Sequence, residues 1–594
     1  MKLHRSGGPQ SPRKQCGRLR RRIAIIVAVL PLSLFAAAAA GGGHAEAQAA
    51  SCSASYSTES EWSGGFVASV TVTDTGTTAL TGWTVTFTFG GDQTVTDPWN
   101  AAVTQSIEYV TATNESYNGS VAVGANTSFG FQGTWSSSDA VPASLTCTPS
   151  TTVTPAIVTN VTSSVPVMQG FTSSFEVALS AAPAASVTVS VSATAGDTGL
   201  SVSSGSSLTF TSSDWDTPQD VTIAANTSGT GSATFTASAS GYTPATATFT
   251  EIASTPAPQL HVSGNELVNA SGNQVILHGM DRSGTEYACV QGWGIFDGPN
   301  DEASILAMKS WGNVTAVRVP LNEACWNAES YVDSTYAGTN YINAIKTYVG
   351  LLNANGIVAI LDLHWTDGLY TGNSSGCSSA EAVCQKPMPD AAEAIPFWTS
   401  VANTFKGNNA VIFDLFNEPY ASRATGSTTT GWECWLNGGT CSGIGYQVAG
   451  MQSMVNAVRS TGASNVLMLG GEEYANDLSE WLQYEPTDPD NNLVASWHSY
   501  NFNTCDTESC WTSEVAPVIA KVPVIVGEMG ENDCGGSYID SLSSWLESEN
   551  TSFLAWTWDD WANGCSTGPT LITNYAGNPT PYGAAYKAIL QALP

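Results

Sequence analysis

The chain has 594 residues, of which 18 are Lys or Arg and 50 are Asp or Glu, so its formal net charge is −32. A chain of this length is too long to fold around one ordinary hydrophobic core, so several domains are expected. A surface this acidic repels phosphate backbones and anionic lipid. The charge therefore argues against nucleic-acid and membrane partners and favours an uncharged polymer.

Residues 1–49 have the features of a secretory signal peptide. Eight Lys and Arg precede a largely apolar run, Ile23–Ala40, and small residues lead to Ala-x-Ala sites at Ala45–Ala47 and Ala47–Ala49. A membrane anchor is the alternative, but no stop-transfer charges follow the run. Arg20–Arg22 leaves the twin-arginine export route open. Removal of this leader would leave 10 Lys and Arg against 49 Asp and Glu, a net charge of −39, on a secreted, extracellular protein.

The number and spacing of the cysteines favour export to an oxidising compartment. Of 13 cysteines, Cys16 belongs to the leader, and the remaining even number contains closely spaced pairs, which predicts disulfide bonds. The absence of any Cys-x-x-Cys pair argues against a zinc site, so we expect no metal and no cofactor. The spacing predicts the pairs Cys52–Cys147, Cys289–Cys325, Cys377–Cys384, Cys434–Cys441, Cys505–Cys510 and Cys534–Cys565.

Residues 51–149 are rich in Ser, Thr, Gly and Val and alternate between polar and apolar side chains. The alternation is clearest in Phe66–Val72 and Trp83–Phe89. Such a period of two, bounded by Gly and Asp, predicts an antiparallel β-sandwich. Trp83 begins an apolar face and is expected in the core.

Three other aromatic residues of this module, Trp62, Trp99 and Tyr117, have polar, turn-like neighbours. Flat rings exposed on a rigid sheet can stack on the apolar C–H faces of sugar rings. The alternative is that one or more of them simply caps the sandwich, as amphipathic aromatic side chains often do.

The order of these features resembles carbohydrate-binding module family 2. The resemblance implies that Trp62, Trp99 and Tyr117 form a surface that binds crystalline cellulose or xylan, with tyrosine at a position where tryptophan is frequent. The matching residues are Cys52, Trp62–Phe66, Gly82–Val85, Trp99–Asn100, Val103–Gln105, Tyr117–Gly119, Phe129–Phe131 and Cys147.

Residues 150–255 contain no cysteine and few aromatic residues. Alternation in Val187–Val191, Ser207–Phe210 and Val221–Ile223 predicts a second all-β sandwich, an immunoglobulin-like spacer. A second sugar-binding module is the alternative. The segment Ser254–Pro258, rich in Pro and Ala, marks the next boundary.

In residues 259–594 the pattern changes to short apolar strands alternating with amphipathic, helix-like segments such as Tyr341–Asn355 and Gln447–Ser460. Eight such strands predict a (β/α)8 barrel. A doubly wound sheet is the rival, but no Gly-x-Gly-x-x-Gly follows the first strand. The strands are expected to end at His278-Gly279, Arg318–Pro320, His364-Trp365, Asn417-Glu418, Gly470-Gly471, His498–Tyr500, Glu528 and Trp556.

Two of these strands end in a glutamate. The apolar run Val411–Phe416 is followed by Asn417-Glu418-Pro419, and Val522–Val526 is followed by Gly527-Glu528. Catalytic residues of barrel enzymes sit at the carboxyl ends of the strands, and two carboxylates there are the minimum equipment for hydrolysis of a glycosidic bond. Either glutamate alone could instead be a helix N-cap neighbour.

The barrel module resembles glycoside hydrolase family 5. Asn417-Glu418-Pro419 matches the family's strand-four motif, and Glu528 matches its strand-seven nucleophile. The resemblance implies that Glu418 is the acid/base, that Glu528 attacks the anomeric carbon, and that Asn417 donates to the sugar 2-hydroxyl.

Five further residues match positions around the family's cleaving subsite. Arg318 would support the nucleophile, Trp556 would stack on a sugar ring, and the others would line the subsite: His364, His498 and Tyr500. The histidines could instead be packing residues, and Arg318 could form a structural salt bridge.

The inserted loops Tyr370–Pro389 and Ala421–Ser442 depart from the family's common cellulase pattern and are expected to shape the cleft beyond the cleaving subsite. Our hypothesis is a monomeric, secreted, retaining endo-β-1,4-glucanase that is directed to cellulose by its N-terminal module. A β-mannanase or xyloglucanase is the enzymatic alternative. A non-catalytic cellulose-binding protein is the alternative of another class, although both glutamates are present.

Overall fold

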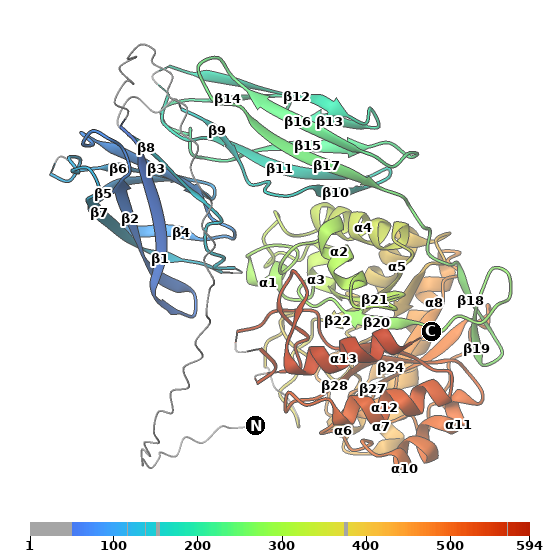
Figure 1. Ribbon diagram of the computed structural model, residues 1–594. Helices are drawn as coiled ribbons and strands as arrows, with labels where there is room; N and C mark the ends of the chain where they lie inside the picture. The colour runs from blue at the N-terminus through green and yellow to red at the C-terminus, as the bar shows by residue number, and fades with distance from the viewer. Residues whose placement is uncertain are drawn as a thin grey trace, which may run out of the picture.

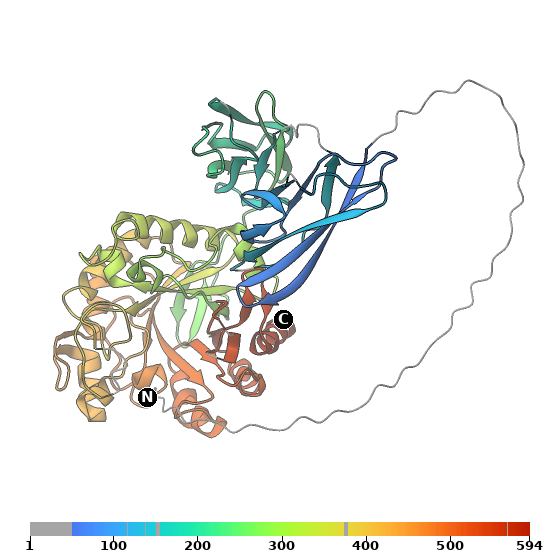
Figure 2. The ribbon, with the colours of Figure 1, turned by 90° about the vertical axis from the view of Figure 1, so that its left-hand side faces the viewer.

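The computed structural model describes residues 50–593 except 116, 137, 150–154, 184, 374–377, 563 and 567. The predicted signal peptide, residues 1–49, lies outside the described residues and stays a prediction. Figures 1 and 2 show two units built of β-sheets followed by a barrel surrounded by helices. Within the described ranges, no helix has the length and apolar character needed to cross a membrane.

The first unit is a sandwich of two four-stranded sheets, in the orders β1-β2-β7-β4 and β5-β6-β3-β8. Its core contains Trp83, Phe129 and Phe131, as the alternating pattern predicts for inward-facing positions. The strands are β1 (Cys52–Trp62), β2 (Gly65–Asp74), β3 (Trp83–Thr88), β4 (Thr94–Trp99), β5 (Ala101–Ser106), β6 (Tyr109–Asn114), β7 (Asn126–Thr134) and β8 (Leu145–Pro149).

The second unit is also a sandwich, with sheets in the orders β10-β17-β16-β12-β14 and β13-β15-β11-β9. Phe175, Phe235 and Phe249 pack in its core. Its strands are β9 (Ile157–Thr159), β10 (Val165–Met168), β11 (Thr172–Leu179), β12 (Val187–Gly196), β13 (Leu200–Ser204), β14 (Ser207–Phe210), β15 (Gln219–Ala225), β16 (Ser232–Ser238) and β17 (Ala245–Ile252).

The second sandwich is docked on the barrel rather than tethered to it. Met168 at the end of β10 is buried in the same apolar cluster as the barrel helices, and the Phe171 ring lies against Gly350 of α4 (Thr339–Ala354). The Thr255 and Ala257 N–H groups donate to backbone carbonyls at the end of α4 (2.7 and 2.8 Å). In Figure 1, β10 accordingly lies directly beside α2 and α4.

The third unit is a closed barrel of eight parallel strands, which confirms the predicted fold class. Alternate apolar side chains such as Ile360, Ile412 and Met468 fill its interior, and the others face the surrounding helices. The strands are β20 (His278–Asp281), β21 (Ala316–Asn322), β22 (Val358–Trp365), β23 (Val411–Asp414), β26 (Leu467–Gly470), β27 (Leu493–Tyr500), β28 (Val524–Gly530) and β29 (Ser552–Ala555).

Helices surround the barrel, and three short pairs of strands accompany it. The helices are α1 (Ala288–Gln291), α2 (Glu302–Lys309), α3 (Glu323–Asn327), α4, α5 (Ala394–Phe405), α6 (Ala421–Thr425), α7 (Thr428–Asn437), α8 (Met451–Ser460), α9 (Glu472–Ala475), α10 (Glu508–Cys510), η1 (Trp511–Val515), α11 (Ala516–Ile519), α12 (Ser537–Ser548), η2 (Gly564–Ser566) and α13 (Pro581–Ala592). The pairs are β18 (Leu260–Ser263) with β19 (Glu266–Asn269), β24 (Gly438–Thr440) with β25 (Gln447–Ala449), and β30 (Ile572–Asn574) with β31 (Asn578–Pro579).

Several predicted boundaries were wrong, three of them as follows. The first barrel strand begins, rather than ends, at His278. The fourth, β23, ends at Asp414, and Asn417 and Glu418 lie in the loop beyond it, where the Asn417 N–H donates to Leu363 O (3.1 Å). Residues 447–449 pair with β24, so the helix predicted from Gln447 begins at Met451. In each case pairing with a distant segment, which is invisible in local periodicity, sets the boundary.

Five of the six predicted cysteine pairs form disulfide bonds in the structure. Cys384 is also disulfide-bonded, but its predicted partner Cys377 lies outside the described residues, so that pairing stays a prediction. The five bonds are Cys52–Cys147, Cys289–Cys325, Cys434–Cys441, Cys505–Cys510 and Cys534–Cys565.

Candidate active site

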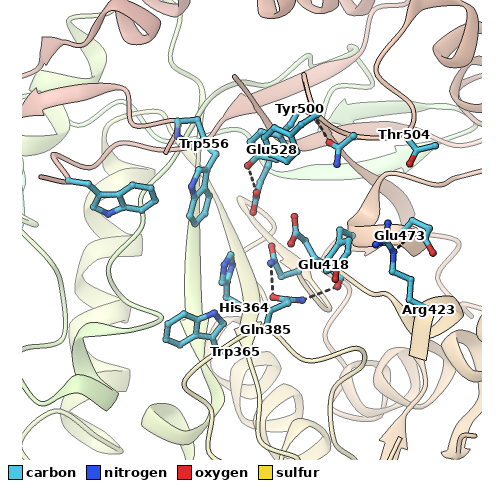
Figure 3. Close-up of a pocket in the computed structure, with 16 residues that line it drawn as sticks. His364, Trp365, Gln385, Glu418, Arg423, Glu473, Tyr500, Thr504, Glu528 and Trp556 are labelled. Atoms are coloured by element: carbon cyan, nitrogen blue, oxygen red, sulfur yellow. Dashed lines mark hydrogen bonds and ion pairs between the residues drawn. The ribbon is translucent and has the colours of Figure 1, made fainter. Parts of the chain in front are cut away.

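A cleft of about 590 Å³ opens at the end of the barrel where the strands finish (Figure 3). Several strands contribute to it, because the carboxyl ends of parallel strands meet at one mouth. The structure brings six of the eight predicted site residues to the cleft wall: His364, Asn417, Glu418, Tyr500, Glu528 and Trp556. Arg318 and His498 are fully buried directly behind them.

Glu528 is a buried carboxylate on β28 that receives two strong hydrogen bonds. The Arg318 guanidinium donates to its Oε1 (2.8 Å), and the Tyr500 hydroxyl donates to its Oε2 (2.6 Å, Figure 3). Burial and the charge of Glu528 raise the pKa of Tyr500 well above its usual value, so the hydroxyl keeps its proton for this bond. These two hydrogen bonds fix the orientation of the carboxylate.

Glu418 faces the same space from the loop after β23. Its Oε1 lies 3.2 Å from His498 Nδ1, and that nitrogen lies 3.6 Å from Glu528 Oε2. One oxygen of each glutamate and a His498 nitrogen all lie within 4.8 Å of one another. Burial, followed by the nearby charge of Glu528, raises the pKa of Glu418 well above its usual value. The pair therefore consists of Glu418, whose raised pKa favours the protonated form, and Glu528, which accepts hydrogen bonds from an arginine and a tyrosine.

Arg318 on β21 is the centre of a buried ionic cluster. Besides Glu528 it contacts the carboxylates of Asp281 (2.9 Å), Asp362 (3.1 Å) and Asp414 (2.9 Å). Burial raises the pKa of Asp281 and Asp414 well above the usual aspartate value, and that of Asp362 to about 7, while the Arg318 charge opposes each rise. A single cation faces four carboxyl groups. The raised pKa values favour protonated aspartates, which limits the negative charge of the cluster.

Both site histidines are electrically neutral. Burial lowers the pKa of His364 to about 4, and burial together with Arg318 lowers that of His498 well below its usual value. His364 Nδ1 and Asp362 Oδ2 share a hydrogen bond (2.6 Å), and the His364 ring stacks on Trp556 (5.3 Å between centroids, 11° between planes). His364 thus fixes the position of the Trp556 ring in the cleft wall.

Asn417 connects the ionic cluster to an inserted loop. Its Oδ1 accepts from Arg318 Nη2 (2.8 Å), and its Nδ2 donates to Gln385 Oε1 (3.2 Å). The Gln385 amide in turn donates to the Glu418 carbonyl (2.8 Å, Figure 3). The predicted donation from Asn417 to a sugar hydroxyl remains a prediction.

The sequence analysis missed the three aspartates around Arg318 and also Gln385. A signal for two of them was present: Asp362 and Asp414 each interrupt an otherwise apolar run of the sequence, and a charge in a buried segment requires a partner. Gln385, in the inserted loop 370–389, carries no comparable signal.

The opposite end of the cleft, away from Trp556, is formed by Arg423 and Glu473 (Figure 3). The Arg423 Nε donates to the Glu473 carboxylate, and the Arg423 guanidinium lies over the Tyr474 ring, 5.1 Å from its centroid. Glu473, Tyr474 and Ala475 have φ values of 57°, 64° and 58°, a left-handed run that is costly for residues with a Cβ. Such strain concentrates at ligand sites.

The three predicted surface aromatics of the first sandwich are exposed: Trp62 by 50%, Trp99 by 40% and Tyr117 by 70%. The Trp62 ring covers Gly65 and the Trp99 ring covers Gly130, positions where a Cβ would come within 2.5 Å of the ring atoms. Both glycines belong to the β1-β2-β7-β4 sheet. The Tyr117 hydroxyl donates to Asn100, next to Trp99 (3.0 Å).

Two groups of side chains in the described ranges have the spacing for a metal ion. In one, Cys505 and Cys510 are joined in a disulfide and offer no thiolate beside Glu514. The other is Glu418, His498 and Glu528, in which both Glu528 oxygens already accept hydrogen bonds, from Arg318 and Tyr500.

A barrel whose mouth holds two opposed glutamates, backed by an arginine and lined by tryptophans, defines a glycoside hydrolase. The model of the family Cellulase (glycosyl hydrolase family 5) matches residues 268–564, half of the chain, and a Cellulose binding domain matches residues 52–152. The chain belongs to glycosyl hydrolase family 5 and carries an N-terminal cellulose-binding domain, as the sequence resemblances predict.

The curated relatives match parts of the chain. Endoglucanase A of Thermobispora bispora is 43% identical over 91 residues, 15% of this chain and 20% of its own length. Mannan endo-1,4-beta-mannosidase of Streptomyces lividans is 22% identical over 344 residues, 55% of this chain and 74% of its own length. A solved β-glucanase from Saccharophagus degradans covers 57% of this chain and 94% of its own, with 17% identity and a TM-score of 0.44. The chain spans only 8–20% of the length of the first curated relatives it matches.

Proposed function

We propose that the protein is a retaining endo-1,4-β-glucanase that acts on cellulose. The observation that carries the proposal is the close approach of Glu418 and Glu528, which have oxygens within 4.8 Å of each other. Retaining glycosidases place their carboxyl groups roughly 5–5.5 Å apart, whereas inverting enzymes need a wider gap for a water molecule.

In the first step, Glu528 Oε attacks the anomeric carbon while Glu418 donates its proton to the leaving glycosidic oxygen, giving a covalent glycosyl-enzyme. The sugar that leaves would lie on the Arg423 and Glu473 side of Glu418, and the sugar that stays would lie against Trp556 (Figure 3). Arg318 and Tyr500 orient the nucleophile.

In the second step, Glu418 acts as a base and takes a proton from the water that releases the sugar. Esterification of Glu528 removes the charge that helps to raise the pKa of Glu418. The pKa of Glu418 therefore falls in the glycosyl-enzyme. At that stage Glu418 must be ionised so that it can take a proton from the attacking water.

We also propose that the protein is secreted and monomeric, and that Trp62, Trp99 and Tyr117 hold it on cellulose. The matching cellulose-binding domain and the exposed rings support the binding role. Hydrolysis of carboxymethylcellulose by the full chain, with the anomeric form of the new reducing end followed by NMR, tests the reaction. Inversion would reject the retaining mechanism.

A β-mannanase is the second candidate, because the S. lividans relative that matches 55% of this chain is a mannan endo-1,4-beta-mannosidase. Parallel assays of the full chain on carboxymethylcellulose, xyloglucan and mannan separate the candidates. A kcat/KM on mannan that exceeds that on carboxymethylcellulose would replace the glucanase proposal.

The proton of Glu418 gives a first testable prediction. Activity should fall as pH rises through the pKa of Glu418, which lies above the usual glutamate value. Replacing Glu528 with Gln removes one cause of the rise, so the Glu418 pKa should decrease in E528Q, as measured by NMR of 13C-labelled glutamate. An unchanged Glu418 pKa in E528Q would mean that the two carboxyl groups do not interact.

The exposed aromatic rings give a second prediction. Trp99→Ala should weaken adsorption to insoluble cellulose about tenfold, since a lost ring contact is worth about 0.5–1.5 kcal/mol beyond its buried area. Activity on soluble carboxymethylcellulose should not change. Val123→Ala, at another exposed apolar residue of the same sandwich, is the matched control. Equal adsorption of W99A and wild type would reject the binding surface.

A further inference from the structure

Glu251, at the end of β17 in the second sandwich, is a buried carboxylate without a partner. It continues the inward-facing series Ala247, Phe249, Glu251 and is 2% exposed. Both of its carboxylate oxygens are buried, and neither has a hydrogen bond. Burial of an uncompensated carboxylate costs several kcal/mol, so a compensating group is expected at this position.

The space beside this carboxylate is kept open by two glycines. A Cβ on Gly199 would lie 3.0 Å from Glu251 Oε2 and 2.7 Å from Asn226 Nδ2, and a Cβ on Gly229 would lie 3.4 Å from the same oxygen. Gly229 has φ +119°, a backbone conformation that residues with side chains rarely adopt. The carboxylate therefore faces a cradle formed by backbone and small residues.

Further oxygen atoms surround the cradle. Asp197 accepts from the Gly199 N–H through Oδ1 (2.8 Å), while its Oδ2 lies beside Gly231. The Asn226 Oδ1 accepts from the Ser228 N–H (2.9 Å). The charge of Asp197 adds to burial in raising the pKa of Glu251, as expected for two carboxylates that approach each other.

No side chain of this module can neutralise the pair. The sequence contains no Lys or Arg between Arg22 and Arg282, and residues 150–255 contain no His. A positive charge beside Glu251 would therefore have to come from outside this module, as a cation from solution can.

We propose that Glu251, Asp197 and the loop 226–231 bind one calcium ion. Carboxylate, amide and backbone oxygens are the ligands that calcium prefers, and its flexible coordination suits an irregular loop. The cradle offers neither thiolate nor imidazole, which argues against zinc and copper.

The site is connected to the junction between sandwich and barrel. The Gln169 amide donates to Gly229 O in the loop, and its Oε1 accepts from the Ser254 N–H (3.0 Å). The Ser254 hydroxyl donates to Ala354 O at the end of α4 (3.3 Å). In Figure 1 the chain passes directly from β17 to the barrel. Calcium would order the loop that holds this junction.

Calorimetric titration of the chelator-treated full chain with CaCl2, at pH 7 and 0.15 M salt, tests the proposal. We expect one saturable site per chain, a higher unfolding temperature in calcium than in chelator, and weaker binding of MgCl2. Glu251→Gln should weaken calcium binding at least tenfold, as should Asp197→Asn. Asp216→Asn, at an exposed aspartate of the same sandwich, should bind calcium like the wild type.

Absence of saturable calcium binding by the wild type would overturn the proposal. It would also be overturned if E251Q and D197N bound calcium as tightly as D216N. A more stable E251Q together with no calcium effect on the wild type would instead identify Glu251 as a protonated carboxyl. If E251Q fails to fold, D197N and the wild-type titration still decide.

Discussion

Glu528→Gln is expected to lower the hydrolysis of soluble glucan by about 10⁴-fold or more, because loss of a covalent nucleophile removes the reaction path rather than a single contact. The amide is nearly the same size, its oxygen can still accept from Arg318, and its NH2 group can donate to the Tyr500 oxygen, so the cleft should keep its shape. Adsorption to cellulose should be unchanged, since Trp62 and Trp99 belong to another module. Initial rates on carboxymethylcellulose and a cellulose pull-down measure the two properties.

Asp540→Asn is the matched control, because Asp540 is an exposed acid on α12 and should tolerate the loss of its charge. Retention of more than a few per cent of activity by E528Q would reject Glu528 as the nucleophile. Loss of adsorption as well as activity would indicate misfolding, which circular dichroism would detect.

Arg318→Met is expected to cost about 3–5 kcal/mol of unfolding free energy, the range found when one partner of a buried ion pair is removed. Methionine fills the space of the aliphatic stem but leaves Asp281, Asp414 and Glu528 without their donor. Urea unfolding at pH 8 measures the loss. Arg423→Met, which breaks an exposed pair with Glu473, should cost about 1 kcal/mol or less.

The pH dependence of this effect distinguishes charge from packing. Without Arg318, the folded-state pKa values of the three aspartates rise further above their unfolded values. Stability contributed by carboxyl groups with raised pKa values is present at low pH and is lost as pH rises through the folded-state pKa. The deficit of R318M should therefore be smaller at pH 4.5 than at pH 8. An equal deficit at both pH values would assign the effect to packing.

The fold class was predictable because its evidence is local. Alternation with a period of two marks both sandwiches, and apolar strands separated by amphipathic segments mark the barrel. Strand ends were less predictable, since β23 stops at Asp414 where its pairing with β22 and β26 stops. That limit depends on the register of the closed barrel, which no single segment contains.

The site was predictable where a motif carries it, as at Asn417-Glu418-Pro419. The ionic cluster was not, because Asp281, Asp362 and Asp414 lie far apart in sequence and meet only when the barrel closes around Arg318. The strained run at Glu473 was also invisible, since Glu473 and Tyr474 carry no preference for positive φ.

The docking of the second sandwich on α4 limits where an N-terminal truncation of the protein can begin. A truncated chain that begins after Pro258 would lack Met168 and Phe171. The apolar helix surface that these residues cover would then face water. It would also remove the two backbone donors that cap the carbonyls of Asn353 and Ala354. The smallest soluble catalytic fragment should therefore begin near Pro155 and retain the second sandwich. This module is then part of the enzyme's folding unit.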